Sequence, residues 1–200
     1  MARPRTFDET TVLEAAAAQF RVHGYADTST EQLCEAAGVR RSSLYNAFTS
    51  KDELFVRALE HYAATMRERQ AAILTDTSLS GAERLRKLVD AIVGEERVAR
   101  DEGHAAGCMS VHTLMNPDVR ARDGRIGRIL ERDLRERLAL LEDTIRAGRA
   151  DGSIPDGPDA AEGALLVNTL IAGLRVTAQT GVAPEVLHRI ALDGLRSLLA

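Results

Sequence analysis

The chain has 200 residues and a net charge of −4, a balance that argues against a general polyanion binder. Its length fits one large domain, or a small domain joined to a larger one. A hydrophobic fraction of 44% is ample for a core, while few aromatics and no tryptophan favour helices over sheets. We therefore predict an all-α protein with about nine helices.

The two cysteines and the N-terminal sequence predict the cellular compartment of the protein. Cys34 and Cys108 fall in dissimilar settings, which argues against a disulfide framework and fits a reducing cytoplasm. The N-terminus lacks the charged-then-apolar pattern of a signal peptide, and no run approaches 18 apolar residues. We expect a soluble, cytoplasmic protein without a membrane partner.

The first residues carry Arg3 and Arg5 and show no periodicity. They form either a disordered tail or an arm whose arginines reach DNA phosphates or a minor groove. A helix is then predicted over residues 8–23, with an apolar stripe on one side and Gly24 at its end.

Residues 28–51 predict two short helices around a glycine turn. A capping box at Thr28 or at Ser29 begins the first helix, and Gly38 ends it. Apolar residues of both helices face a core, and six polar residues project from the second: Arg40, Arg41, Ser42, Ser43, Tyr45 and Asn46. This arrangement is typical of a helix-turn-helix, whose second helix enters the DNA major groove.

Longer helices follow. The first extends to about Leu74 and would be roughly 35 Å long, so it could join two halves of the molecule. Further helices are predicted over residues 82–100, 108–115, 119–148, 158–180 and 184–199. The expected organisation is a helix-turn-helix domain over residues 1–51 and a larger helical domain over residues 52–200.

The predicted helix 158–180 is apolar nearly all round, so both of its faces need cover. Burial inside the monomer would satisfy it, but the last two helices carry more apolar surface than one small core needs. A two-fold dimer would also bring two reading helices to successive major grooves, about 34–36 Å apart. We therefore predict a homodimer, with interface candidates Leu166, Leu170, Gly173, Leu174, Leu187, Ile190 and Leu198.

The run AAGVRRSSLYNAFTSKDELF, with TSTEQL before it and FRVHGY upstream, resembles the N-terminal domain of TetR-family transcriptional regulators. The specific motifs cover residues 7–60, and an all-helical pattern of matching length covers the rest. The resemblance implies a DNA-binding regulator, most often a repressor, with an N-terminal reading domain and a C-terminal ligand-binding and dimerising domain.

The resemblance also implies roles for individual residues. Thr30 matches the helix-start hydroxyl beside a phosphate, and Tyr45 and Lys51 match phosphate ligands. The variable front of the reading helix, where base edges are met, is occupied by Arg40, Arg41, Ser42 and Ser43. The family often has histidine where this chain has Ala47, which removes one backbone contact. The doubled arginine hints at guanine, and either arginine could face the bases.

Cys108 follows Gly107 near a helix start and has two interpretations. It is either a small buried hydrophobe facing a ligand pocket or a reactive thiol that senses oxidants or electrophiles. His104, Cys108 and His112 would align as soft metal ligands on a continuous helix, but the glycines nearby interrupt one and a fourth ligand is not evident. We predict no metal and no cofactor.

Catalytic motifs are not found: the sequence has no nucleophile elbow, phosphate-cradling glycine loop or HExxH, so we do not expect an enzyme. The leading hypothesis is a repressor of a palindromic operator, released by a small, largely hydrophobic effector. Its pocket candidates are Tyr62, Met66, Ile92, Cys108, Met109, His112, Met115, Asn168, Ile171 and Arg175. The alternatives are a thiol-sensing repressor acting through Cys108, and a helical adaptor or enzyme with a coincidental helix-turn-helix.

Overall fold

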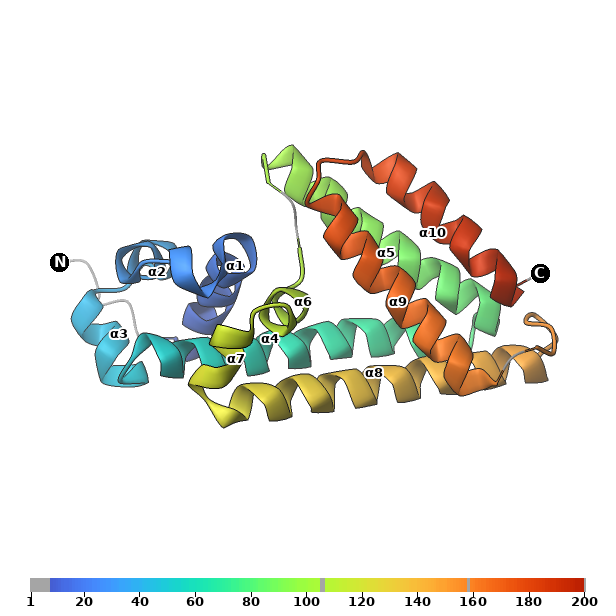
Figure 1. Cartoon of the computed structure of the whole chain (residues 1–200), viewed down its shortest axis with the longest axis horizontal. Helices are drawn as coiled ribbons and strands as arrows, with labels where there is room; N and C mark the ends of the chain where they lie inside the picture. The colour runs from blue at the N-terminus through green and yellow to red at the C-terminus, as the bar shows by residue number, and fades with distance from the viewer. Residues whose placement is uncertain (1–7, 105–106, 158, 200) are drawn as a thin grey trace. The chain divides into compact units, whose positions relative to one another are not determined.

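The structure is a computed structural model that describes residues 8–104, 107–157 and 159–199. Within these residues the chain forms ten α-helices and no strand (Figure 1). The prediction of an all-α fold with an N-terminal helix-turn-helix is confirmed.

The helices form two compact units, here called the first unit (residues 8–64 and 109–130) and the second unit (the remaining described residues). The first unit contains α1 (Glu9–Asp27), α2 (Thr30–Ala37), α3 (Arg41–Phe48), α6 (Met109–Leu114), α7 (Pro117–Arg122) and the beginnings of α4 (Lys51–Leu74) and α8 (Gly124–Ala150). The second unit contains α5 (Gly81–Asp101), α9 (Ala160–Ala178), α10 (Pro184–Leu199) and the rest of α4 and α8. The expected domain boundary after residue 51 stays a prediction, and the packing units do not follow it.

The single helix predicted over residues 119–148 is in fact two helices. Asp123 has an extended backbone between α7 and α8, and its carboxylate accepts a hydrogen bond from the Arg125 amide at 2.8 Å. Asn116 caps α7 through the Val119 amide, with Pro117 in the first turn. An apolar stripe in the sequence indicates which face of a helix is buried. One residue with extended backbone barely changes that periodicity, so the break at Asp123 could not be predicted from it.

The helix-turn-helix begins and ends as its sequence predicts. Ser29 and Gln32 form the capping box of α2, and Gly38 ends the helix in the left-handed conformation. Thr28, the alternative cap, is buried and its hydroxyl donates instead to the Gly24 carbonyl at 2.5 Å. Gly24 itself has a non-helical backbone and kinks α1 (φ 76°).

The core of the first unit joins α1 to the helix-turn-helix and to α4. Phe20 makes edge-to-face contact with Phe55, with ring centres 5.0 Å apart, and Tyr25 packs against the same Phe55 ring at 5.2 Å. Leu33 of α2 and Phe48 of α3 are also buried and complete this core. These apolar residues orient α3 so that its polar face is left outside.

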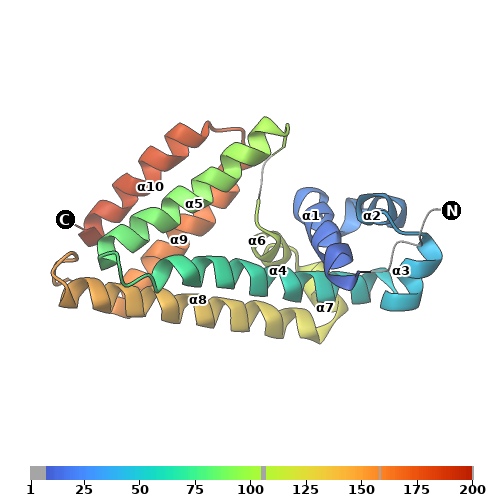
Figure 2. The same cartoon turned by 180° about the vertical axis from the view of Figure 1, so that it is seen from behind.

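The second unit is built around α5, α9 and α10, which lie side by side (Figures 1 and 2). Its core includes Leu85, Ile92, Leu141, Ile171 and Leu195. α9 is long and apolar enough to cross a membrane by length and composition alone. Its contacts with α5 and α10 give it the cover that its sequence requires on one face.

Glycine allows α5 to begin in direct contact with α8. A Cβ atom on Gly81 would lie 2.4 Å from the Gly148 Cα and 2.8 Å from the Thr144 carbonyl oxygen. Both neighbours are backbone atoms, so they cannot move aside without displacing a helix. Glycine is required here by close approach.

We expect Gly81→Ala to lower the free energy of unfolding by about 1–3 kcal/mol, the usual cost of overpacking. Gly94→Ala, in the middle of the same helix, is the control, because a Cβ there meets nothing within 4 Å. That change should stabilise the protein by about 0.5–1 kcal/mol. Urea unfolding followed by circular dichroism measures both, and equal effects would contradict the close-approach argument.

Candidate DNA-binding surface and effector cavity

The helix α3 presents one buried and one exposed side. Leu44 and Phe48 anchor it to the core of the first unit. The side chains of Arg41, Ser42 and Asn46 are exposed, and Arg40, immediately before the helix, is exposed as well. Ser43 and Tyr45 are half-buried at its edge. The outward face therefore consists of hydrogen-bonding and cationic groups.

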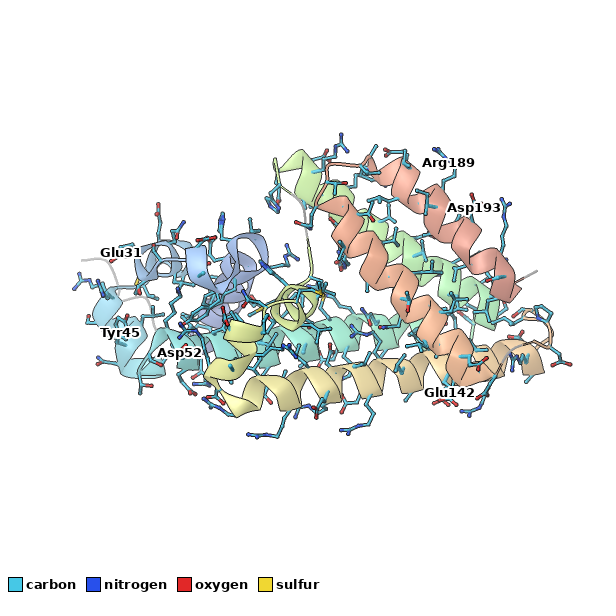
Figure 3. The ribbon with its side chains drawn as sticks, viewed as in Figure 1. Glu31, Tyr45, Asp52, Glu142, Arg189 and Asp193 are labelled. Carbon is cyan, nitrogen blue, oxygen red and sulfur yellow. The ribbon has the colours of Figure 1, made fainter. Side chains whose placement is uncertain are left out.

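Contacts between α2 and α3 fix that face. The hydroxyl oxygens of Thr30 and Tyr45 lie 3.2 Å apart, within hydrogen-bonding distance. Arg41 donates to Glu31 at 3.0 Å, and its guanidinium lies 5.6 Å from the centre of the Tyr45 ring. Figure 3 labels Glu31 and Tyr45, on α2 and α3. Thr30, Arg41 and Tyr45, to which the family resemblance assigns DNA contacts, therefore lie next to one another.

Lys51 begins α4 beside this surface. Its ammonium nitrogen lies 4.4 Å from the centre of the Tyr25 ring, a cation–π distance. Burial lowers the pKa of Lys51, and the neighbouring charge of Arg122 lowers it further, while Asp52 opposes both. Lys51 therefore has a defined position, whereas a lysine in solvent would be free to rotate.

A polar cluster behind Lys51 was not anticipated from the sequence. Asp52 accepts hydrogen bonds from the Tyr25 hydroxyl at 2.6 Å and from Arg122 at 3.1 Å. Seventy positions separate Asp52 from Arg122 along the chain. No periodic pattern relates two residues so far apart, so only the packed fold could show the pair.

The predicted arm residues Arg3 and Arg5 lie outside the described residues. Their role stays a prediction.

The second unit contains a cavity of about 370 Å³ at the C-terminal ends of α5 and α9 and the start of α10. Its lining combines apolar and polar groups: Glu96, Arg100, Gly103, His104, Ala178, Gln179, Gly181, Val182, Pro184 and Leu187. Its size falls within the range of small-molecule sites.

A buried ion pair supports one wall of this cavity. Arg175, 6% exposed, donates to the carboxylate of Glu96, 3% exposed, at 2.8 Å and also pairs with Glu95. Removal of Arg175 would take the paired cation from a carboxylate that is only 3% exposed, which is strongly destabilising.

The ten predicted pocket residues are divided between the two units. Tyr62, Met109, His112 and Met115 belong to the first unit and the other six to the second. Ile92 and Ile171 are core residues, and Met115 is 75% exposed. None of the ten lines the 370 Å³ cavity, although Arg175 pairs with one of its lining residues. Their grouping into one pocket stays a prediction.

The predicted dimer residues divide in a similar way. Leu174, Leu187 and Leu198 are buried in the core of the second unit, where α9 and α10 pack, so they are not available to a partner. Leu166, Gly173 and Ile190 are exposed and Leu170 is half-buried. Figure 3 shows Arg189 and Asp193 on the outer side of α10, one residue before and three residues after Ile190 in sequence.

Cys34 and Cys108 are both half-buried free thiols. Cys34 lies on α2, and burial raises the pKa of its thiol. Gly107 has a left-handed backbone and α6 begins only at Met109, so His104 and Cys108 lie outside the helix that holds His112. Among the described residues, no cluster of three or more metal-ligating side chains forms.

The first unit thus has the features of a helix-turn-helix DNA-binding protein: a capped first helix, a left-handed glycine turn and a second helix with a polar outer face. Comparison with known proteins defines the class further. Residues 12–58 match the sequence model of "Bacterial regulatory proteins, tetR family". The transcriptional repressor ComR of Escherichia coli is 29% identical over 198 residues, which is 97% of this chain and 90% of ComR.

Solved structures are similar over 96–98% of the chain. A cysteine mutant of the TetR-family regulator CifR, in complex with a 26-bp operator DNA, is 32% identical with a TM-score of 0.79, covering 98% of this chain and all of that one. A regulatory protein TetR from Rhodobacter sphaeroides has a TM-score of 0.84 at 20% identity and supports the fold alone. The chain belongs to the TetR family of DNA-binding transcriptional regulators.

Proposed function

We propose that the protein is a homodimeric repressor that binds a palindromic operator in the cytoplasm and is released by a small-molecule effector. One observation carries the proposal: the exposed polar face of α3 adjoins the aligned side chains of Thr30 and Tyr45 in the first unit. CifR, a relative with similar fold and sequence, is described in complex with operator DNA.

In this proposal α3 enters the major groove. Arg40, Arg41, Ser42, Ser43 and Asn46 meet base edges, while Thr30, Tyr45 and Lys51 meet phosphates. Arg41 pairs with Glu31 at the exposed surface, an interaction that water and DNA can both replace at small cost. An arginine released in this way could pair bidentately with guanine.

Lys51→Ala should weaken binding to all DNA sequences and lower the slope of log affinity against log salt by about 0.9 for each bound chain. Arg41→Ala should instead cost about 1–3 kcal/mol at one base position of the operator. Fluorescence anisotropy with the upstream intergenic fragment, and with single-base variants of it, separates the two effects. An unchanged salt slope in Lys51→Ala would show that Lys51 does not contact phosphate.

We place the dimer interface on the exposed side of α9. Leu165, Leu166 and Val176 expose apolar surface there, and large exposed apolar patches mark association sites. The 26-bp operator of CifR is longer than the stretch that one reading helix contacts, since successive major grooves recur about every 10 bp. A second copy of the chain is the partner that would place a second reading helix on such a site.

Val176→Arg should convert the dimer to a monomer, because two buried guanidinium groups would face each other across a two-fold axis. Val98→Arg is the control: Val98 is 61% exposed on α5, against 52% for Val176, so the same charge is added at a similar solvent exposure. Light scattering after size exclusion gives the mass. If both variants kept the dimer mass, α9 would not be the interface.

We propose the 370 Å³ cavity of the second unit as the effector site. Its apolar lining from α9 and α10 suits a largely hydrophobic molecule, and the buried Glu96–Arg175 pair supplies fixed polar groups at one wall. Binding there can release the operator only if the effector favours the released state by a few kcal/mol.

Mass spectrometry of small molecules that co-purify with the protein tests this assignment. Val182 is a half-buried lining residue, so Val182→Trp should fill part of the cavity and abolish retention of the effector, while operator affinity without effector is preserved. Undiminished retention in this variant would place the effector elsewhere.

The chemical alternative, release through oxidation or alkylation of Cys108, stays open because its thiol is only half-buried. Cys108→Ser should abolish release of operator by an oxidant such as hypochlorite if this alternative holds. Cys34→Ser is the matched control with the other free thiol. Equal release from both variants and the wild type would exclude thiol sensing.

A further inference from the structure

We propose that Asp52 and Arg122 are positioning residues for operator binding: together with the Tyr25 ring they hold the Lys51 ammonium group where a phosphate is met. The inference rests on the proposed phosphate contact of Lys51. It assigns part of the DNA-binding function to α7, a helix that follows α3 by almost seventy residues.

The link is a single carboxylate oxygen shared by three helices. Oδ1 of Asp52, in the first turn of α4, accepts from the Tyr25 hydroxyl of α1 at 2.6 Å and from Nη1 of Arg122 at the end of α7 at 3.1 Å. Hydrogen bonds to an ionised acceptor are stronger than neutral ones. The three helix ends are therefore tied at the residue next to Lys51.

The Tyr25 ring provides a surface for both cations. Its centre lies 4.4 Å from the Lys51 ammonium nitrogen and 4.5 Å from the Arg122 guanidinium carbon. Phe20 and Phe55 pack against the ring, and its hydroxyl is bonded to Asp52, so the ring cannot turn away. Burial and the hydrogen bond to Asp52 raise the pKa of Tyr25 to about 12.

The two cations would repel each other without the carboxylate. Asp52 lies next to both, so its negative charge offsets that repulsion and opposes the loss of charge on Lys51. A free lysine side chain samples many rotamers. A lysine that is already held in place loses less rotamer entropy when it binds a phosphate, and this smaller loss is the source of the positioning effect.

A second ion pair lets this link be tested without loss of the fold. Arg125 donates to Glu53 at 2.6 Å and to Asp123 at 2.7 Å. Glu53 follows Asp52 in α4, and Asp123 directly follows α7. If Arg122 is changed, this second pair still attaches the start of α8 to α4. The variant Arg122→Gln should therefore stay folded.

The test is a double-mutant cycle on operator affinity, measured with the full-length protein over a range of salt concentrations. Arg122→Gln should weaken binding about fivefold, as expected for loss of one partly exposed cation–π and ion-pair interaction, and should lower the salt slope. In a Lys51→Ala background the same change should have no further effect. Arg120→Gln, an exposed arginine on the same helix, is the control for net charge and should weaken binding less than twofold.

Two results would overturn the inference. Additive losses in the cycle would mean that Arg122 contacts phosphate itself, and unchanged affinity in Arg122→Gln would mean that it has no part in binding. If Lys51→Ala alone leaves affinity and slope unchanged, the underlying phosphate assignment fails first, and the two failures are thereby distinguished.

A spectroscopic readout separates positioning from general stability. In Asp52→Asn, the ultraviolet titration of Tyr25 should shift to lower pH, because both the charge and the acceptor that raise its pKa are weakened. Tyr25→Phe keeps the ring but loses the hydroxyl and should weaken operator binding less than Arg122→Gln. Full operator affinity in Asp52→Asn with a shifted Tyr25 titration would overturn the role of Asp52.

Discussion

The main constraint on this protein is electrostatic: a chain with negative net charge binds DNA, which is itself strongly negative. The net charge is −4, and residues 1–64 hold nine acidic against seven basic side chains. Residues 109–130, which pack in the same unit, add four arginines against two aspartates, so residues 1–64 and 109–130 of the sequence together have no net charge. Affinity for DNA then depends on where each cation is held, since a general positive field is absent.

The ion pairs of the first unit serve this constraint. Asp52 and Glu53, in the first turn of α4, would by charge alone repel a phosphate near Lys51. Their pairing with Arg122 and Arg125 neutralises them and stabilises the contact of α4 with the segment around α7. The hydrogen bonds of Arg125 also lower the pKa of Asp123 to about 2, so that carboxylate stays ionised. The proposed operator surface therefore depends on residues to which the proposal assigns no DNA contact.

In the second unit the constraint is one of packing. The packing of α9 against α5 and α10 leaves only part of the apolar surface of α9 exposed. That remainder is the surface proposed for a second copy of the chain. The cavity at the ends of α5 and α9 occurs where helix termini and loops pack less closely than the helix faces do.

The sequence by itself determined the features that arise from neighbours along the chain. The glycine turn at Gly38, the inward Leu44 and Phe48 and the outward Arg41 all follow from spacings of three to four residues in a helix, while the capping box was narrowed only to Thr28 or Ser29. The family followed from the same stretch. Tertiary structure alone decided the break at Asp123, the burial of Leu187 and Leu198, the location of the cavity and the pairing of Asp52 with Arg122. Helical periodicity tells which side of a helix is apolar, but the choice of the helix that covers it, and of the charge that meets a distant charge, is made only when the whole chain packs.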